Sequence, residues 1–128
     1  MRTLHLLAIL SLLVFTGCHD PHVSGHVKFS DGTPLTGGVV ILQNETSQGI
    51  GEIYPDGSFT MYQYKPGDGL KRGQYKGYIS GAVIADDAGN TTSLIPAKYA
   101  DMSASGITYD SDKDKGKLDI VIDAKPPN

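Results

Sequence analysis

Apolar and polar residues alternate one by one in several short runs of this sequence, and this period of two constrains the fold more than any other feature. In residues 23–29 the odd positions are Val, Gly, Val and Phe, whereas the even positions are Ser, His and Lys. A strand with one buried face has this pattern, because successive side chains point to opposite faces. Sixteen Gly and seven Pro, spread along the chain, supply turns between such runs. The sequence therefore predicts an all-β domain.

The same pattern predicts about seven strands. They cover residues 23–29, 39–44, 50–54, 58–64, 74–85, 107–109 and 118–123. Residues 50–54 and 58–64 flank the turn sequence PDG and are predicted to pair antiparallel. Residues 86–106 lack a clear period, and a stretch of this length is expected to hold a helical turn or to serve binding. Together these features predict a seven-stranded antiparallel β-sandwich.

The first 17 residues have the layout of a cleaved signal peptide. Arg2 precedes an apolar run over residues 6–15, which is half of the roughly 20 residues that a membrane-spanning helix needs. The following FTGC, residues 15–18, resembles the lipobox of bacterial lipoproteins, with Phe15 where Leu is usual. This resemblance implies cleavage between Gly17 and Cys18 and lipidation, by palmitate among other acyl chains, of Cys18. The alternative is ordinary cleavage, which would release a secreted, soluble β-sandwich with an exposed thiol.

Two longer stretches resemble carboxypeptidase-regulatory-like domains of the transthyretin (prealbumin) type. They are VSGHVKFSDGTPLTGGVVIL, with a G-x-V strand and a D-G-x-P-L-x-G turn, and DGSFTMYQYKPGDGLKRGQYKGYIS. The resemblance implies a small bacterial lipoprotein carrying a β-sandwich. It divides the chain into a signal peptide (1–17), a lipidated tether (18–22), the sandwich domain (23–124) and a tail (125–128). A fold of this kind does not identify the ligand that a protein binds.

Several motifs are poor matches to metal or nucleic-acid sites. The formal net charge is -3, and the basic residues show no dense cluster beyond Lys71 and Arg72, which excludes a nucleic-acid footprint. His22 and His26 are four apart on a predicted strand, about 13 Å from each other, and so cannot chelate one ion. From Asp110, the sequence DSDKDKGKLDIV begins like a calcium loop but has Lys and Val where Gly and Glu are required. We expect no metal and no cofactor.

The sequence also lacks a convincing catalytic set. Ser80 in GYISG is one position away from the nucleophile-elbow spacing, and Gly49-Ile50-Gly51 lacks the third glycine of a phosphate-binding loop. Every histidine after residue 17 lies within residues 19–26. The transthyretin-type fold includes a hydrolase of hydroxyisourate that ends in Tyr-Arg-Gly-Ser, whereas this chain ends KPPN. A non-enzymatic protein is therefore predicted, with such a hydrolase as the alternative.

Four tyrosines are candidates for a partner surface: Tyr62, Tyr64, Tyr78 and Tyr99, together with residues 86–106. The alternation places Tyr62, Tyr64 and Tyr78 opposite the predicted core residues of their strands, and amphipathic aromatic side chains are good interface anchors. The alternative is ordinary cross-strand pairing on a solvated sheet. The expected partners are the membrane, through the lipid, and an envelope protein or glycan. His19 follows Cys18 where some bacteria place an acidic inner-membrane retention signal, which favours the outer membrane.

Overall fold

The structure is a computed structural model that describes residues 20–123, and it is all-β. Residues 1–19 and 124–128, which include the predicted signal peptide, its cleavage site and Cys18, lie outside the described residues. A three-stranded sheet has the order β4 (Ser58–Thr60), β1 (Ser24–Phe29), β9 (Ile120–Ile122). A four-stranded sheet has the order β3 (Gln48–Glu52), β2 (Val39–Gln43), β5 (Gln74–Ser80), β8 (Ile107–Asp110). A separate hairpin consists of β6 (Val83–Ala85) and β7 (Thr91–Ser93), and the short helical elements are η1 (Ala97–Ala100) and α1 (Ser111–Asp114).

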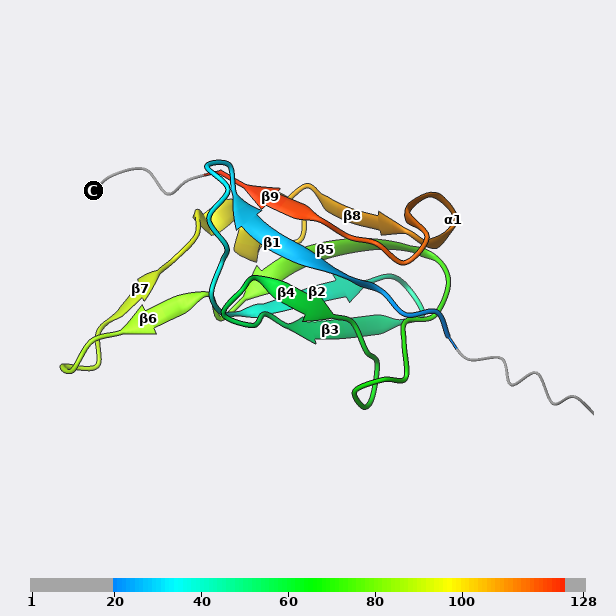
Figure 1. Ribbon diagram of the computed structural model, residues 1–128, viewed down its shortest axis with the longest axis horizontal. Helices are drawn as coiled ribbons and strands as arrows, with labels where there is room; N and C mark the ends of the chain where they lie inside the picture. The colour runs from blue at the N-terminus through cyan, green and yellow to red at the C-terminus, as the bar shows by residue number, and fades with distance from the viewer. Residues whose placement is uncertain (1–19, 124–128) are drawn as a thin grey trace, which may run out of the picture.

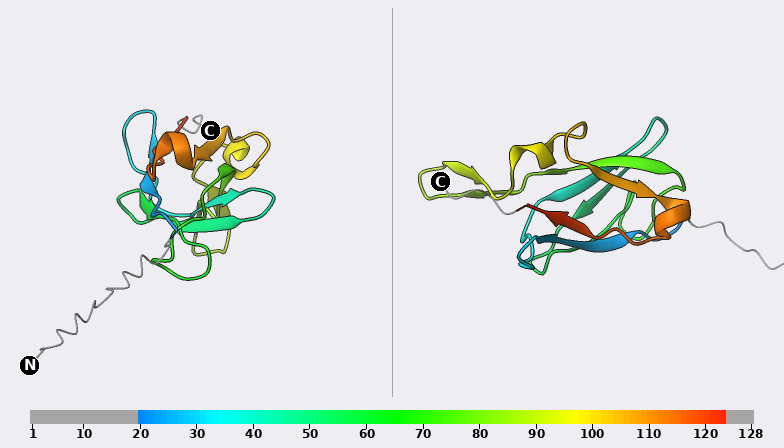
Figure 2. Two further views of the ribbon diagram at one scale, coloured as in Figure 1. Left: turned by 90° about the vertical axis from the view of Figure 1, so that its right-hand side faces the viewer. Right: turned by 90° about the horizontal axis from the view of Figure 1, so that it is seen from above.

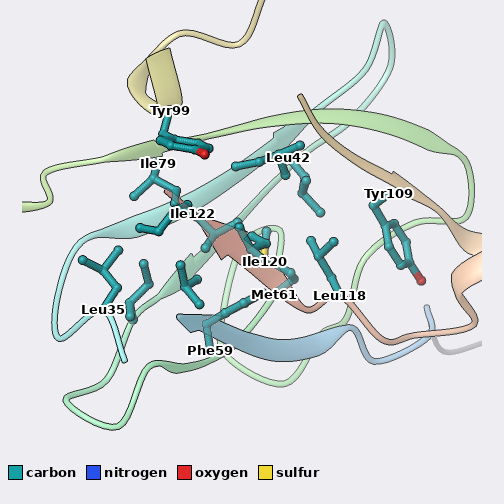
Figure 3. Close-up of a cluster of buried hydrophobic side chains, with 14 of the residues drawn as sticks. Leu35, Leu42, Phe59, Met61, Ile79, Tyr99, Tyr109, Leu118, Ile120 and Ile122 are labelled. Carbon is teal, nitrogen blue, oxygen red and sulfur yellow. The ribbon is translucent and has the colours of Figure 1, made fainter. Parts of the chain in front are cut away.

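The hydrophobic core lies between the two main sheets, as Figure 3 shows. The alternation in β2 buries Val40 and Leu42, and the opposite sheet contributes Val27, Phe59 and Ile122; each of these five side chains is at most 1% exposed. Burial of one such side chain contributes about 1.5 to 3 kcal/mol. Burial at Val27, Phe59 and Ile122 therefore follows the predicted alternation, whereas β2 is an apolar run whose buried face is decided by packing.

The first and last strands lie side by side in the three-stranded sheet (Figure 1). They run parallel, with Val27 opposite Ile120, so the prediction of a purely antiparallel arrangement is wrong. After β8 the chain leaves the four-stranded sheet, passes through α1 and continues as β9, which runs in the same direction as β1. A Cβ added to Gly25 would lie 1.7 Å from the carbonyl oxygen of Leu118. Only glycine leaves room for this backbone approach.

The predicted hairpin of residues 50–54 and 58–64 is only partly formed. Tyr54 N–H donates to the Ser58 carbonyl at 2.9 Å, and Ile50 and Tyr62 form an isolated bridge. Between these two points β4 pairs with β1, while β3 pairs with β2. The turn therefore carries the chain from the four-stranded sheet to the three-stranded sheet. β3 and β4 form more backbone pairs with β2 and β1 than with each other.

The prediction of one strand over residues 74–85 is wrong. The chain turns at Gly81, where φ is +68°, and Ala82 packs into the core at 3% exposure. The turn separates β5 from β6, and the region predicted to be irregular, 86–106, contains β7 and η1. Nine strands, not seven, therefore occur in residues 20–123, since β6 and β7 form a hairpin of their own.

Candidate interaction surface

The β6–β7 hairpin, residues 83–93, projects from one end of the molecule along its long axis (Figures 1 and 2), and we call it the arm. All six residues of its two strands are exposed. They include Val83 at 48% and Ile84 at 56% exposure. These two neighbours point to opposite faces of the hairpin, so the arm presents apolar surface on both sides.

Asp86 orders the tip of the arm. Its carboxylate accepts hydrogen bonds from the N–H of Ala88 at 3.0 Å and of Asn90 at 2.8 Å, and from the Asn90 side-chain amide at 3.2 Å. The backbone N–H of Asn90, then its side chain, hold the pKa of Asp86 below its ordinary value. The tip is thus a defined turn that keeps β6 and β7 in register.

The outer edge of β6 has unpaired backbone groups. At the base of the arm Leu94 N–H donates to the Ala82 carbonyl, and at its tip Asp86 N–H donates to the Asn90 carbonyl. Because antiparallel ladders alternate bonded and non-bonded pairs, the C=O of Val83 and the N–H of Ala85 point away from β7. Such an edge is a template for another strand.

Two of the four predicted tyrosines lie in one row on the outer face of the four-stranded sheet. The register places Tyr62 opposite Ile50, Ile50 opposite Ile41, and Ile41 opposite Tyr78. All four side chains are half-buried. Tyr62 and Tyr78 are three strand spacings apart, about 14 Å. This row is flat and apolar, with the polar residues Gln43, Gln48 and Lys76 in the next row.

The other two tyrosines lie elsewhere. Tyr64 is 93% exposed in the loop between β4 and β5. Tyr99 is only 6% exposed on η1, where its hydroxyl accepts a hydrogen bond from Asp123 N–H at 3.0 Å and Lys98 Nζ lies 5.0 Å from its ring. Tyr99 is therefore part of the core and not a surface anchor. The four tyrosines do not form a single surface.

The histidine and acidic residues singled out in the sequence lie on a strand and at a helix start. His26 faces Ser58 across the β1–β4 ladder, but the Ser58 hydroxyl donates to Asp56 at 2.6 Å. At the start of α1 the Asp110 carboxylate accepts from Asp112 N–H at 2.9 Å, and this residue caps the helix. Within residues 20–123, no group of three or more His, Cys, Asp or Glu side chains could hold a metal ion.

The weakly matching GIG and GYISG motifs have a packing role or lie at the surface. A Cβ on Gly49 would lie 2.5 Å from the Leu70 side chain, and one on Gly51 would lie 2.8 Å from Met61 Sδ. These glycines let β3 approach the core, and Ser80 is exposed at the end of β5.

Comparison of the chain with protein-family models, curated proteins and solved structures finds no match. In the part of the chain that the structure describes, no helix is both long and apolar enough to cross a bilayer.

The arm is the surface feature that the sequence patterns missed. Val83 and Ile84 lie within the single strand that the sequence predicts over residues 74–85. The signal that identifies a separate hairpin is Gly81 followed by the turn sequence DDAGN, residues 86–90.

Proposed function

We propose that the mature chain is a lipid-anchored, non-enzymatic β-domain of the bacterial cell envelope that binds a protein partner through the arm. The partner contributes a β-strand to the outer edge of β6. The lipid anchor is supported by the FTGC sequence at Cys18 and the signal-peptide layout before it. Residence at the outer membrane is supported by His19, since no acidic residue follows the cysteine.

The observation that carries this proposal is the projecting arm with exposed Val83 and Ile84. A two-stranded hairpin alone is at best marginally stable in water, whereas three or more strands with an apolar face are stable. Addition of a partner strand would pair the C=O of Val83 and the N–H of Ala85 and would cover apolar surface. A preordered tip lowers the entropy lost when the partner binds.

We propose further that the domain is a sandwich of the transthyretin type. Support comes from the D-G-x-P-L-x-G turn. Asp31 accepts from Thr33 N–H at 2.9 Å, and Leu35 is 1% exposed and donates its N–H to the Val27 carbonyl. The motif thus ties the end of β1 to the core. Seven strands in the two main sheets are consistent with this class of fold.

The lipid anchor is tested by metabolic labelling. Radiolabelled palmitate is expected to enter the wild-type chain and not the Cys18→Ala variant. Equal labelling of both chains would contradict the anchor.

The arm is tested by site-specific photo-crosslinking in intact cells from position 84. A crosslink of one reproducible mass is expected from this position and not from Tyr78 on the sheet. Ala85→Pro removes the outward N–H and is expected to abolish the crosslink, since proline is tolerated where a strand's N–H faces away from its ladder.

Thr91→Pro is the matched control, because Thr91 lies opposite Ala85 in the register and its N–H faces the other edge of the arm. This variant is expected to keep the crosslink. Equal crosslinking by the Ala85→Pro and Thr91→Pro variants would overturn strand addition at β6. Turnover of hydroxyisourate by the purified chain would overturn the non-enzymatic assignment.

A further inference from the structure

We propose that the loop between β4 and β5, residues 63–72, docks on the lipid headgroups beside the anchor and holds the arm away from the membrane. This inference rests on the proposed lipidation of Cys18. The loop is a second point of contact with the lipid, made by protein side chains, and this contact determines how the domain is oriented on the membrane.

The loop is bonded directly to the first described residues of the chain. Gln63 Nε2 donates to Asp20 Oδ2 at 2.8 Å, and Leu70 N–H donates to the Pro21 carbonyl at 3.0 Å. A Cβ on Gly69 would lie 2.4 Å from the Asp20 carbonyl oxygen. The loop and the entry of the chain therefore form one packed unit.

The covalent path from the anchor to this unit is short. Asp20 is two residues from Cys18, which an extended chain spans in about 7 Å. The headgroup layer of a bilayer is about 5 to 7 Å thick on each side. A lipid on Cys18 therefore keeps Asp20, and the loop residues bonded to this entry of the chain, within about the depth of the headgroup layer.

The loop presents the side chains that favour a membrane interface. Tyr64 is 93% exposed, and tyrosine is enriched at the boundary between headgroups and water. Tyr64 and Lys71 line one shallow depression, and Arg72 lines another with Pro21. Lys71 and Arg72 are exposed, and their cationic groups suit the phosphates of anionic lipids.

The acidic group of the loop, Asp68, is bonded to the backbone of the loop itself. The Asp68 carboxylate accepts hydrogen bonds from the N–H of Gln63 at 2.9 Å, of Tyr64 at 2.9 Å and of Lys65 at 3.1 Å. These bonds fix the loop and hold Tyr64 in position before it meets the membrane. Leu70, at 1% exposure, anchors the other side of the loop in the core.

The arm lies at the opposite end of the molecule. Figure 1 shows the described chain starting at one end of the long axis and β6–β7 projecting at the other. When the loop contacts the headgroups, the arm points away from the membrane, toward the proposed protein partner. The β3–β4 turn, which contains Tyr54 at 58% exposure, lies toward the arm end and supplies a matched control.

The test places an environment-sensitive, thiol-reactive fluorophore at Tyr64→Cys or Tyr54→Cys. Each full-length gene product is purified in its lipidated form and reconstituted into vesicles containing phosphatidylglycerol. Acylation blocks the thiol of Cys18, so the fluorophore enters the introduced cysteine. The position-64 label is expected to show blue-shifted emission and loss of quenching by aqueous iodide. The position-54 label is expected to behave as in water.

Neutralising two cations with Lys71→Ser and Arg72→Ser is expected to reduce the protected fraction of the position-64 label, because each charge lost lowers the docking equilibrium constant about fivefold. Equal iodide quenching at positions 64 and 54, with Cys18 blocked, would overturn the docking of the loop and leave the anchor intact. Reaction of the fluorophore with Cys18 in the wild-type chain would instead overturn the anchor and, with it, the orientation proposed here.

Discussion

The buried hydroxyl of Ser105 is predicted to contribute to stability, because it makes two hydrogen bonds to backbone groups at the end of the β5–β8 ladder. Ser105 is 8% exposed, its Oγ donates to the Gly77 carbonyl, and it accepts from Ile107 N–H at 3.1 Å. Gly77 and Ile107 are directly opposite each other in the β5–β8 register. The hydroxyl thus bonds to the carbonyl of one residue and the N–H of its partner across the ladder.

Ser105→Ala removes both hydrogen bonds at once. A buried donor or acceptor left without a partner costs about 1 to 3 kcal/mol. Because Gly77 and Ile107 remain partners in the ladder, we expect the free energy of unfolding to fall by about 1 to 3 kcal/mol. For a domain of this size such a change lowers the melting temperature by about 5 to 15 °C.

The assay is urea unfolding of the purified chain at neutral pH, with Ser103→Ala as the control. The Ser103 hydroxyl also makes a hydrogen bond, to Asp101 at 2.6 Å, but this residue is exposed. Its loss is expected to change the stability by no more than about 0.5 kcal/mol. If Ser105→Ala and Ser103→Ala shift the urea midpoint equally, Gly77 and Ile107 have found other partners and the reasoning is refuted.

Two further predictions concern turn carboxylates and strand packing. Hydrogen bonds hold the pKa of six aspartates below the ordinary 3.8: Asp31, Asp56, Asp68, Asp86, Asp101 and Asp123. These carboxyl groups bind protons more readily in the unfolded chain than in the folded one. The stabilisation that they contribute is therefore fully present above pH 3.8, and the free energy of unfolding is expected to decrease as the pH falls through their lowered pKa values. A melting temperature that stays constant from pH 5 to about pH 2 would contradict this. Gly25→Ala places a Cβ 1.7 Å from the Leu118 carbonyl oxygen. This variant is expected to separate β9 from β1 and to destabilise the fold by more than about 3 kcal/mol. The control in the same thermal-melting assay is Gly37→Ala, because the space around its Cβ is open.

The sequence by itself determined which side chains face the core in the strands that alternate apolar with polar residues, but not in the apolar run of residues 82–85. Phe59 and Met61 are buried while Tyr62 is half-buried, and Tyr75 and Ile79 are buried while Tyr78 is half-buried, as the alternation predicts. This could be predicted because the period of two is a property of the extended backbone itself, independent of which strand lies alongside.

Only the tertiary structure decided which strands are neighbours and where the candidate surfaces lie. Contacts between distant segments decide three features. They pair β1 with β9 in parallel, they separate the arm from β5 at Gly81, and they bury Tyr99 in the core. The loop of residues 63–72 reads as an ordinary turn in sequence, yet its bond to Asp20 spans 43 positions of the chain. The physical reason is that alternation specifies a face for each strand and no partner, so pairing is chosen by packing and backbone hydrogen bonding of the whole domain.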